Sequence, residues 1–150
     1  MKQENYRSSI HADISPKEAF DSINYVSGWW TENIEGNSEK LDDVFTVHFG
    51  ETFVIFKIIE SVPYKKIAWL VTDCHLPWLK DKKEWSNTTV SWEISTENNL
   101  TKIDMTHIGL VTDIECYTNC EKGWNHYIQD SLFKLITEYE GVPQRKQELV

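Results

Sequence analysis

One long amphipathic segment near the end of the chain limits the available folds more than any other feature. From Glu115 to Tyr139, apolar side chains recur at i, i+3, i+4 and i+7, which is typical of a helix with one buried face. The residues on that face are Cys120, Trp124, Tyr127, Ile128, Ser131, Leu132, Leu135 and Ile136. Such a helix would be about 36 Å long. Gly141 and Pro143 then predict its end.

The chain before this helix is dominated by alternating apolar and polar residues, the pattern of half-buried strands. The predicted strands are Tyr6–Ile14, Val44–Gly50, Thr52–Ser61, Lys65–Cys74, Ser86–Thr96 and Leu100–Leu110. Gly50-Glu51 and the turn at residues 97–99 join neighbouring strands closely enough for hairpins. We therefore expect an antiparallel sheet of about six or seven strands.

Two short helices are predicted after the first strand. Ser15 is a good N-cap, and Glu18 three residues later completes a capping box. Gly28 is expected to break this helix, and Trp29-Trp30 to begin a short second element. The polar residues 33–43 are predicted to form a loop.

The predicted elements give an α+β fold in which a curved antiparallel sheet wraps around the long terminal helix. Only that helix is large enough to cover the apolar face of the sheet. One helix cannot fill a curved sheet along its whole length, so a cavity of about 300–1,000 Å³ is expected. Its opening is predicted near Trp29-Trp30 and the loop around Pro77. All 150 residues are expected to form one domain, with a tail after about residue 141.

Composition and charge exclude several classes of partner. Lys and Arg number 15 against 24 Asp and Glu, and the resulting net charge of −9 argues against binding nucleic acid or anionic lipid. The chain has no apolar run near the ~20 residues of a membrane helix, so no membrane insertion is expected. No secretory signal follows the first residues, which predicts a cytoplasmic protein.

The cysteines offer one candidate metal site. Cys116 and Cys120 would share a helix face, and Cys74-His75 ends a predicted strand, so together they hold four soft ligands. The Cys-x-x-Cys spacing of many structural zinc sites is missing, and cysteine is among the most buried residue types. We expect packed thiols with no metal and no cofactor; a redox pair is the other alternative.

His107 lies on the apolar face of a predicted strand, without a placed nucleophile or carboxylate. It is interpreted either as a hydrogen-bonded core histidine or as a polar group that orients a ligand. The sequence contains no nucleophile elbow, dinucleotide loop or phosphate loop. We therefore name no catalytic residue.

The aromatic residues are the most informative candidates for a site. Five of them should converge on the interior between sheet and helix, either as plain core or as the wall of a cavity for a flat apolar ligand: Trp30, Trp69, Trp92, Trp124 and Tyr127. The predicted cavity residues are Trp30, Phe49, Phe56, Trp69, Trp92, Met105, His107, Trp124, Tyr127 and Ile128. The expected partner is a small hydrophobic or aromatic ligand.

An ordered set of short motifs carries a resemblance that spans roughly residues 8 to 141. The motifs are Ser15-Pro16 with Phe20, Gly28-Trp29-Trp30-Thr31, Phe49-Gly50, Trp69, Trp92, Thr106-His107-x-Gly109-Leu110, Gly123-Trp124-x-x-Tyr127 and Ser131-Leu132. The chain resembles the SRPBCC superfamily of START-like helix-grip domains and, within it, the family named after the activator of heat-shock-protein-90 ATPase homologue. The resemblance implies a helix-grip fold, a cytosolic location and a hydrophobic cavity. Co-chaperone members usually add an N-terminal chaperone-binding domain, for which this length leaves no room.

Three functions are compatible with these features. The first is non-enzymatic binding of a small molecule, which a mostly apolar internal void would favour. The second is a co-chaperone-like interaction that stimulates a heat-shock-protein-90-type ATPase, which a large exposed apolar patch would favour. The third is a hydrolase or cyclase that uses the cavity, which a buried acid/base pair would favour.

Overall fold

A seven-stranded antiparallel sheet forms the framework of the part of the chain that the structure describes. This computed structural model describes residues 5–77, 79–80, 82–111 and 117–144. The strands are β1 (Asn5–Ala12), β2 (Ile34–Gly36), β3 (Val44–Phe49), β4 (Thr52–Val62), β5 (Lys66–His75), β6 (Thr89–Glu97) and β7 (Leu100–Val111). Their spatial order is β1-β7-β6-β5-β4-β3-β2. The predicted antiparallel sheet is therefore confirmed.

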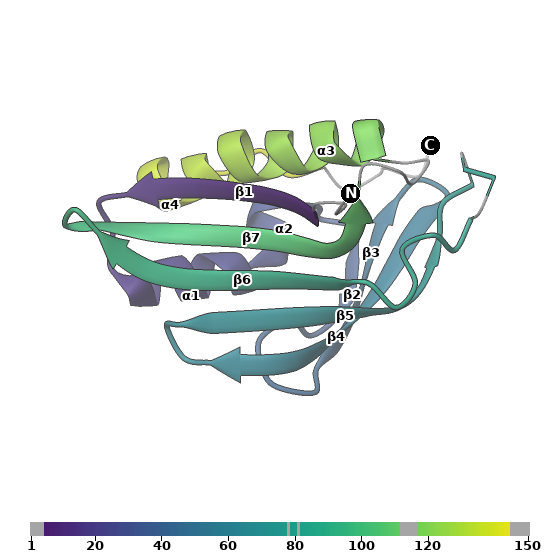
Figure 1. Cartoon of the computed structure of the whole chain (residues 1–150), viewed down its shortest axis with the longest axis horizontal. Coiled ribbons are helices and arrows are strands. Elements are labelled where there is room, and N and C mark those ends of the chain that lie inside the picture. Colours follow the sequence, from purple (N-terminus) through teal and green to yellow (C-terminus); the bar gives the residue numbers. More distant parts are fainter. Residues whose placement is uncertain (1–4, 78, 81, 112–116, 145–150) are drawn as a thin grey trace.

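The helices pack on one side of this sheet. They are α1 (Pro16–Asn24), α2 (Val26–Trp29), α3 (Tyr117–Asn125), the π-helical segment η1 (His126–Leu132) and α4 (Phe133–Glu138). Figure 1 shows α3, η1 and α4 as one continuous helical rod that runs beside β1 and β7. This arrangement is the predicted helix-grip fold. The expected helix start at Glu115 lies outside the described residues, and no helix of the described chain is long and apolar enough to cross a membrane.

The start of α1 follows the predicted capping box. The Glu18 backbone N–H donates to Ser15 Oγ at 3.1 Å, and the Ser15 N–H donates to Glu18 Oε1 at 3.3 Å. The predicted break at Gly28 is wrong, because α1 ends at Asn24, with Tyr25 as its C-cap, and Gly28 lies inside α2. A Cβ on Gly28 would come within 2.4 Å of the Tyr25 ring, so this glycine serves close packing rather than helix termination.

The predicted loop at residues 33–43 contains the short edge strand β2. Ile34, Glu35 and Gly36 pair with Val47, Thr46 and Phe45 of β3. This strand has no buried side chain, so no apolar alternation marks it. Backbone pairing with an existing edge, rather than burial, explains β2.

The interior is formed by the inward faces of the long strands. The predicted alternation of β6 and β7 is confirmed, since Val90, Trp92, Ile103, Met105 and His107 are all buried. Several of the largest buried side chains are aromatic. Those that are almost completely inaccessible include Trp29, Trp69, Trp92, Phe45 and Phe56.

The C-terminal helix departs from the uniform α-helix predicted for it. Seven residues form a π-helical segment that carries Ile128, Ser131 and Leu132 into the interior. Ser131 Oγ donates to the Trp29 carbonyl at 2.6 Å and accepts from the Val142 N–H at 2.7 Å. One hydroxyl thus joins this segment to α2 and to the chain that follows α4.

The residues after α4 turn back toward α2. Thr31 and Gln144 form a parallel β-bridge. The Gln144 N–H donates to the Trp30 carbonyl, and the Glu32 N–H donates to the Gln144 carbonyl, both at 2.9 Å. Residues expected to form a tail therefore contribute to the position of Trp30.

Candidate functional site

A pocket of about 210 Å³ lies where the rod of α3 and η1 passes the β3–β4 hairpin. We call it the aromatic pocket. The described residues that line it are Trp30, Phe49, Thr52, Val54, Leu76, Trp85, Asn119, Cys120, Gly123, Trp124 and Tyr127. It lies between Trp30 and the loop after β5, where the sequence predicts the opening.

Four separate parts of the chain supply its wall. Trp30 follows α2, Phe49 ends β3, and Trp85 belongs to the segment between β5 and β6. The helical rod supplies residues three or four apart, which therefore lie on one face of the helix: Asn119, Cys120, Gly123, Trp124 and Tyr127. Packing of long-range elements, not a local motif, creates the pocket.

Ring contacts fix the aromatic wall. The Trp30 and Trp124 ring centroids lie 4.8 Å apart, and Trp30 also contacts Phe49 at 5.7 Å. Trp85 and Trp124 are nearly parallel, with 6° between their planes and 6.0 Å between their centroids. Because each ring is held by another, the wall is rigid and presents flat apolar faces.

His107 lies directly behind this wall and is completely buried. The Trp124 indole N–H donates to His107 Nδ1 at 3.1 Å, so Nδ1 must be the acceptor. Nε2 then carries the proton and donates to Thr88 Oγ1 at 2.8 Å, while that hydroxyl donates to the Trp85 carbonyl at 2.6 Å. The ring is therefore neutral and fully hydrogen-bonded.

Burial lowers the pKa of His107 to about 3, because a charged imidazolium would lose its hydration in this interior. The histidine holds two wall residues, Trp124 directly and Trp85 through Thr88. Its observed contacts match the interpretation as a hydrogen-bonded core histidine.

The structure places the predicted cavity residues in two groups. Trp30, Phe49, Trp124 and Tyr127 line the aromatic pocket. The other six lie beneath it in the packed core, each almost inaccessible: Phe56, Trp69, Trp92, Met105, His107 and Ile128. Whether any of the ten contacts a ligand stays a prediction.

The pocket is smaller than the 300 Å³ or more that the sequence analysis expects. The core tryptophans fill much of the space between sheet and helix, since Trp69 and Trp92 meet edge to face at 5.4 Å and Trp29 meets Trp92 at 5.5 Å. Among the described residues, the indole N–H groups of Trp69 and Trp92 have no hydrogen-bond acceptor. They lie within this cluster of rings.

Seven lining residues were not predicted as cavity residues. Cys120 and Gly123 could have been found, because they lie one helical turn from Trp124 and Tyr127. Asn119 belongs to the same surface. Val54 could also have been found, because it lies two residues from Phe56 on one face of β4. Thr52, Leu76 and Trp85 carry no such signal, because hairpin and loop geometry bring them to the pocket.

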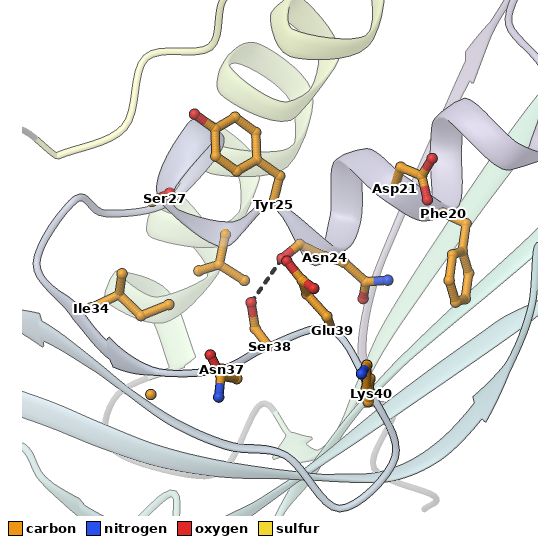
Figure 2. A pocket seen from close by; sticks show the side chains of 12 residues that line it. Phe20, Asp21, Asn24, Tyr25, Ser27, Ile34, Asn37, Ser38, Glu39 and Lys40 are labelled. Atoms are coloured by element: carbon orange, nitrogen blue, oxygen red, sulfur yellow. Dashed lines mark hydrogen bonds between the residues drawn. The ribbon is translucent and has the colours of Figure 1, made fainter.

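A second, larger hollow of about 600 Å³ lies between α1, α2 and the chain around β2. We call it the polar hollow. Figure 2 shows its wall, in which Phe20 and Asp21 come from α1 and Glu39 and Lys40 from the loop after β2. Ser38 Oγ donates to the Asn24 carbonyl at 2.8 Å across it, the bond that Figure 2 marks.

The candidate metal site can be examined only in part, because Cys116 lies outside the described residues. Cys74 and Cys120 are both buried and neither forms a disulfide. Within the described ranges, no group of three or more His, Cys, Asp or Glu side chains could hold a metal ion.

The fold and the aromatic pocket define a START-like helix-grip domain. The chain belongs to the family described as "Activator of Hsp90 ATPase homolog 1-like protein", which it matches over residues 18–137. No curated protein matches the chain in sequence.

Solved structures share this fold at low sequence identity. The Aha1 dimer from Colwellia psychrerythraea has a TM-score of 0.71 at 20% identity, with 91% of this chain and 96% of that chain covered. DynU16, from the dynemicin biosynthetic locus, has a TM-score of 0.68 at 11% identity, with 97% of this chain but 52% of that chain covered. CalU16 from Micromonospora echinospora has a TM-score of 0.59 at 12% identity, with 91% and 86% covered. At these identities the likeness concerns the fold alone.

Proposed function

We propose that this protein binds a small hydrophobic or aromatic molecule in the aromatic pocket and does not catalyse a reaction on it. The observation that carries the proposal is the wall itself. Three tryptophans, a phenylalanine and a tyrosine from distant parts of the chain converge on one opening. Ligand sites of this kind are mostly apolar, with a few polar groups that orient the ligand.

The polar groups at the pocket fit binding better than acid/base chemistry. Thr52, Asn119 and Tyr127 offer hydroxyl and amide groups for hydrogen bonds. Burial raises the pKa of Tyr127 further above its ordinary value of 10, so its phenol is a hydrogen-bond donor at neutral pH. Of the described lining residues, none is a histidine or a carboxylate that could act as a general base near neutral pH.

Tryptophan emission tests the proposal directly, because Trp30, Trp85 and Trp124 form the wall. A screen of lipids and flat aromatic compounds should find ligands that change the emission in a saturable way. Native mass spectrometry of protein purified from its own host should show a bound small molecule. Unchanged emission across the screen, together with a mass equal to the bare chain, would contradict the proposal.

A second candidate is an interaction that stimulates a heat-shock-protein-90-type ATPase. Family membership favours it, and so do two exposed apolar rings beside the end of the helical rod. Tyr25 is 58% exposed and Tyr139 is 80% exposed, and both border one shallow hollow with Leu135. An ATPase assay with the purified chaperone tests this candidate; a rate that does not change on titration with the protein would refute it.

A further inference from the structure

We propose that Gly123 sets the width of the aromatic pocket and that the pocket limits its ligand to an aromatic compound of one or two fused rings without a negative charge. The inference rests on the proposed ligand binding and names the class of ligand.

The pocket volume limits the size of the ligand. A dry apolar cavity of about 150 Å³ holds one benzene molecule. The aromatic pocket measures about 210 Å³, which leaves room for a bicyclic ring but not for a tricyclic ring or a sterol. The packed tryptophans beneath it prevent deeper entry.

The wall also limits the charge of the ligand. No Lys, Arg, His, Asp or Glu occurs among its described lining residues. A carboxylate group carried into the pocket would lose its hydration without gaining an ion pair, and it would meet the negative faces of the tryptophan rings. The net charge of −9 disfavours anions further.

The ring geometry favours flat ligands over flexible chains. Trp30, Trp85 and Trp124 present large rigid faces, and neighbouring rings already fix their positions. An aromatic ligand gains offset or edge-to-face contacts with such faces in addition to apolar burial. An alkyl chain of equal volume would lose more rotational freedom for fewer contacts.

Gly123 is the one lining residue whose identity local structure does not explain. It lies inside α3, where glycine is less favourable than every residue except proline. Its backbone has no positive φ, and a Cβ built on it would meet no described atom within 4 Å. The other helical glycine, Gly28, has a packing reason, since a Cβ there would strike the Tyr25 ring at 2.4 Å. At Gly123 the absent side chain leaves space in the pocket, and we assign that space to the ligand.

Calorimetric titration with 2-naphthol tests whether Gly123 sets the width of the aromatic pocket. Wild-type protein should bind it, Gly123→Ala should weaken binding about tenfold, and Gly123→Leu should weaken it about 100-fold, since one methylene in a tight pocket is worth about 10–200-fold. Lys122→Leu is the matched control. This variant introduces leucine at an exposed neighbouring position outside the pocket wall, and it should leave the affinity for 2-naphthol unchanged.

Circular dichroism separates a blocked pocket from a misfolded variant, because leucine and alanine both favour helix over glycine. Both Gly123 variants should therefore melt no lower than wild type. If Gly123→Leu fails to fold, Gly123→Ala alone decides. Unchanged 2-naphthol affinity in a folded Gly123 variant would overturn the inference and leave the proposed function standing.

Two further probes test the ligand class on wild-type protein. Phenanthren-9-ol tests size, and 2-naphthoate tests negative charge. Each should bind at least tenfold more weakly than 2-naphthol. Equal or tighter binding of either would overturn the corresponding limit. No binding by any of the three probes would overturn the inference, and no response in the wider screen of lipids and aromatic compounds would overturn the proposed function as well.

Discussion

The polar hollow and the aromatic pocket differ in volume, in the charge of their walls and in the parts of the chain that form them. The polar hollow is the larger, at about 600 Å³ against about 210 Å³ for the aromatic pocket. Its described wall comes from one stretch of sequence, residues 20–40, and includes charged side chains. The aromatic pocket draws its wall from residues 30 to 127 and includes no charged side chain among the described ones.

Volume alone does not decide which of the two is the better candidate for a ligand site. Charged groups in the polar hollow are hydrated, and a ligand would have to replace that water with equally good partners. The aromatic pocket offers rings already fixed by neighbouring rings, so a ligand gains apolar burial at little cost in ordering the protein. The smaller hollow is therefore the better candidate site.

The largest expected effect contrasts one wall residue from each hollow. Trp124→Ala should lower the free energy of unfolding by about 3–5 kcal/mol, because it removes a buried ring and leaves His107 Nδ1 without its donor. Tyr25→Ala should change it by only about 0.5 kcal/mol, because Tyr25 is mostly exposed. Urea unfolding measures both. Comparable losses would show that the polar hollow is as well packed as the aromatic pocket.

The next effect concerns pH and involves His107, which lies behind the wall of the aromatic pocket. Folded His107 has a pKa of about 3, below the ordinary 6.5 of an unfolded histidine, so the unfolded chain binds one more proton between these values. Stability should therefore fall as pH falls below 6.5, by up to about 1.4 kcal/mol per pH unit.

His107→Gln provides the comparison for that slope. Between pH 7 and pH 5 the variant should lose less stability than wild type, although it starts lower because one buried hydrogen bond changes. Unfolding curves at both pH values measure the difference. Parallel losses in the two proteins would show that His107 does not titrate in this range on unfolding.

A smaller effect on stability is expected from the N-cap of α1, which lies beside the polar hollow and not beside the aromatic pocket. Ser15→Ala removes the N-cap of α1, which carries one wall of the polar hollow, and should cost about 0.5–2 kcal/mol. Glu18→Ala should cost less, because its contact with the Ser15 N–H is exposed and 3.3 Å long. Both variants should keep the wild-type affinity for 2-naphthol. Equal costs would mean that both halves of the capping box contribute alike.

The smallest expected effect is the response to metal chelation. Treatment with a chelator should leave the melting temperature unchanged, and elemental analysis should find no stoichiometric zinc. Thiol titration in denaturant should give three thiols, one for each cysteine. One equivalent of zinc would contradict this prediction and redirect attention to Cys120 in the aromatic pocket.

Local patterns were enough to predict the main elements. Alternation in β6 and β7 identified Val90, Trp92, Ile103 and Met105 as inward residues, and the Ser15–Glu18 spacing identified the start of α1. Both depend on residues close in sequence. The helix-grip arrangement followed because only one predicted helix was long enough to cover the sheet.

The pocket was only partly predictable, because its wall is set by distances between elements. Trp30 and Trp69 look equally suitable in sequence, yet Trp30 lines the pocket and Trp69 is packed beneath it. Trp85 lies in the segment between β5 and β6, and no periodic pattern orients it. The π-helical turn also leaves no sequence pattern distinct from an α-helix with the same apolar stripe.

Trp30 belongs to the pocket wall and also to the short bridge with the end of the described chain. Its carbonyl accepts the Gln144 N–H, and the Gln144 carbonyl accepts the Glu32 N–H. Amide protons held in such bonds exchange with deuterium only when that part of the structure opens. A ligand that contacts Trp30 is therefore expected to slow deuterium uptake at the Glu32 and Gln144 amides, although neither side chain lines the aromatic pocket.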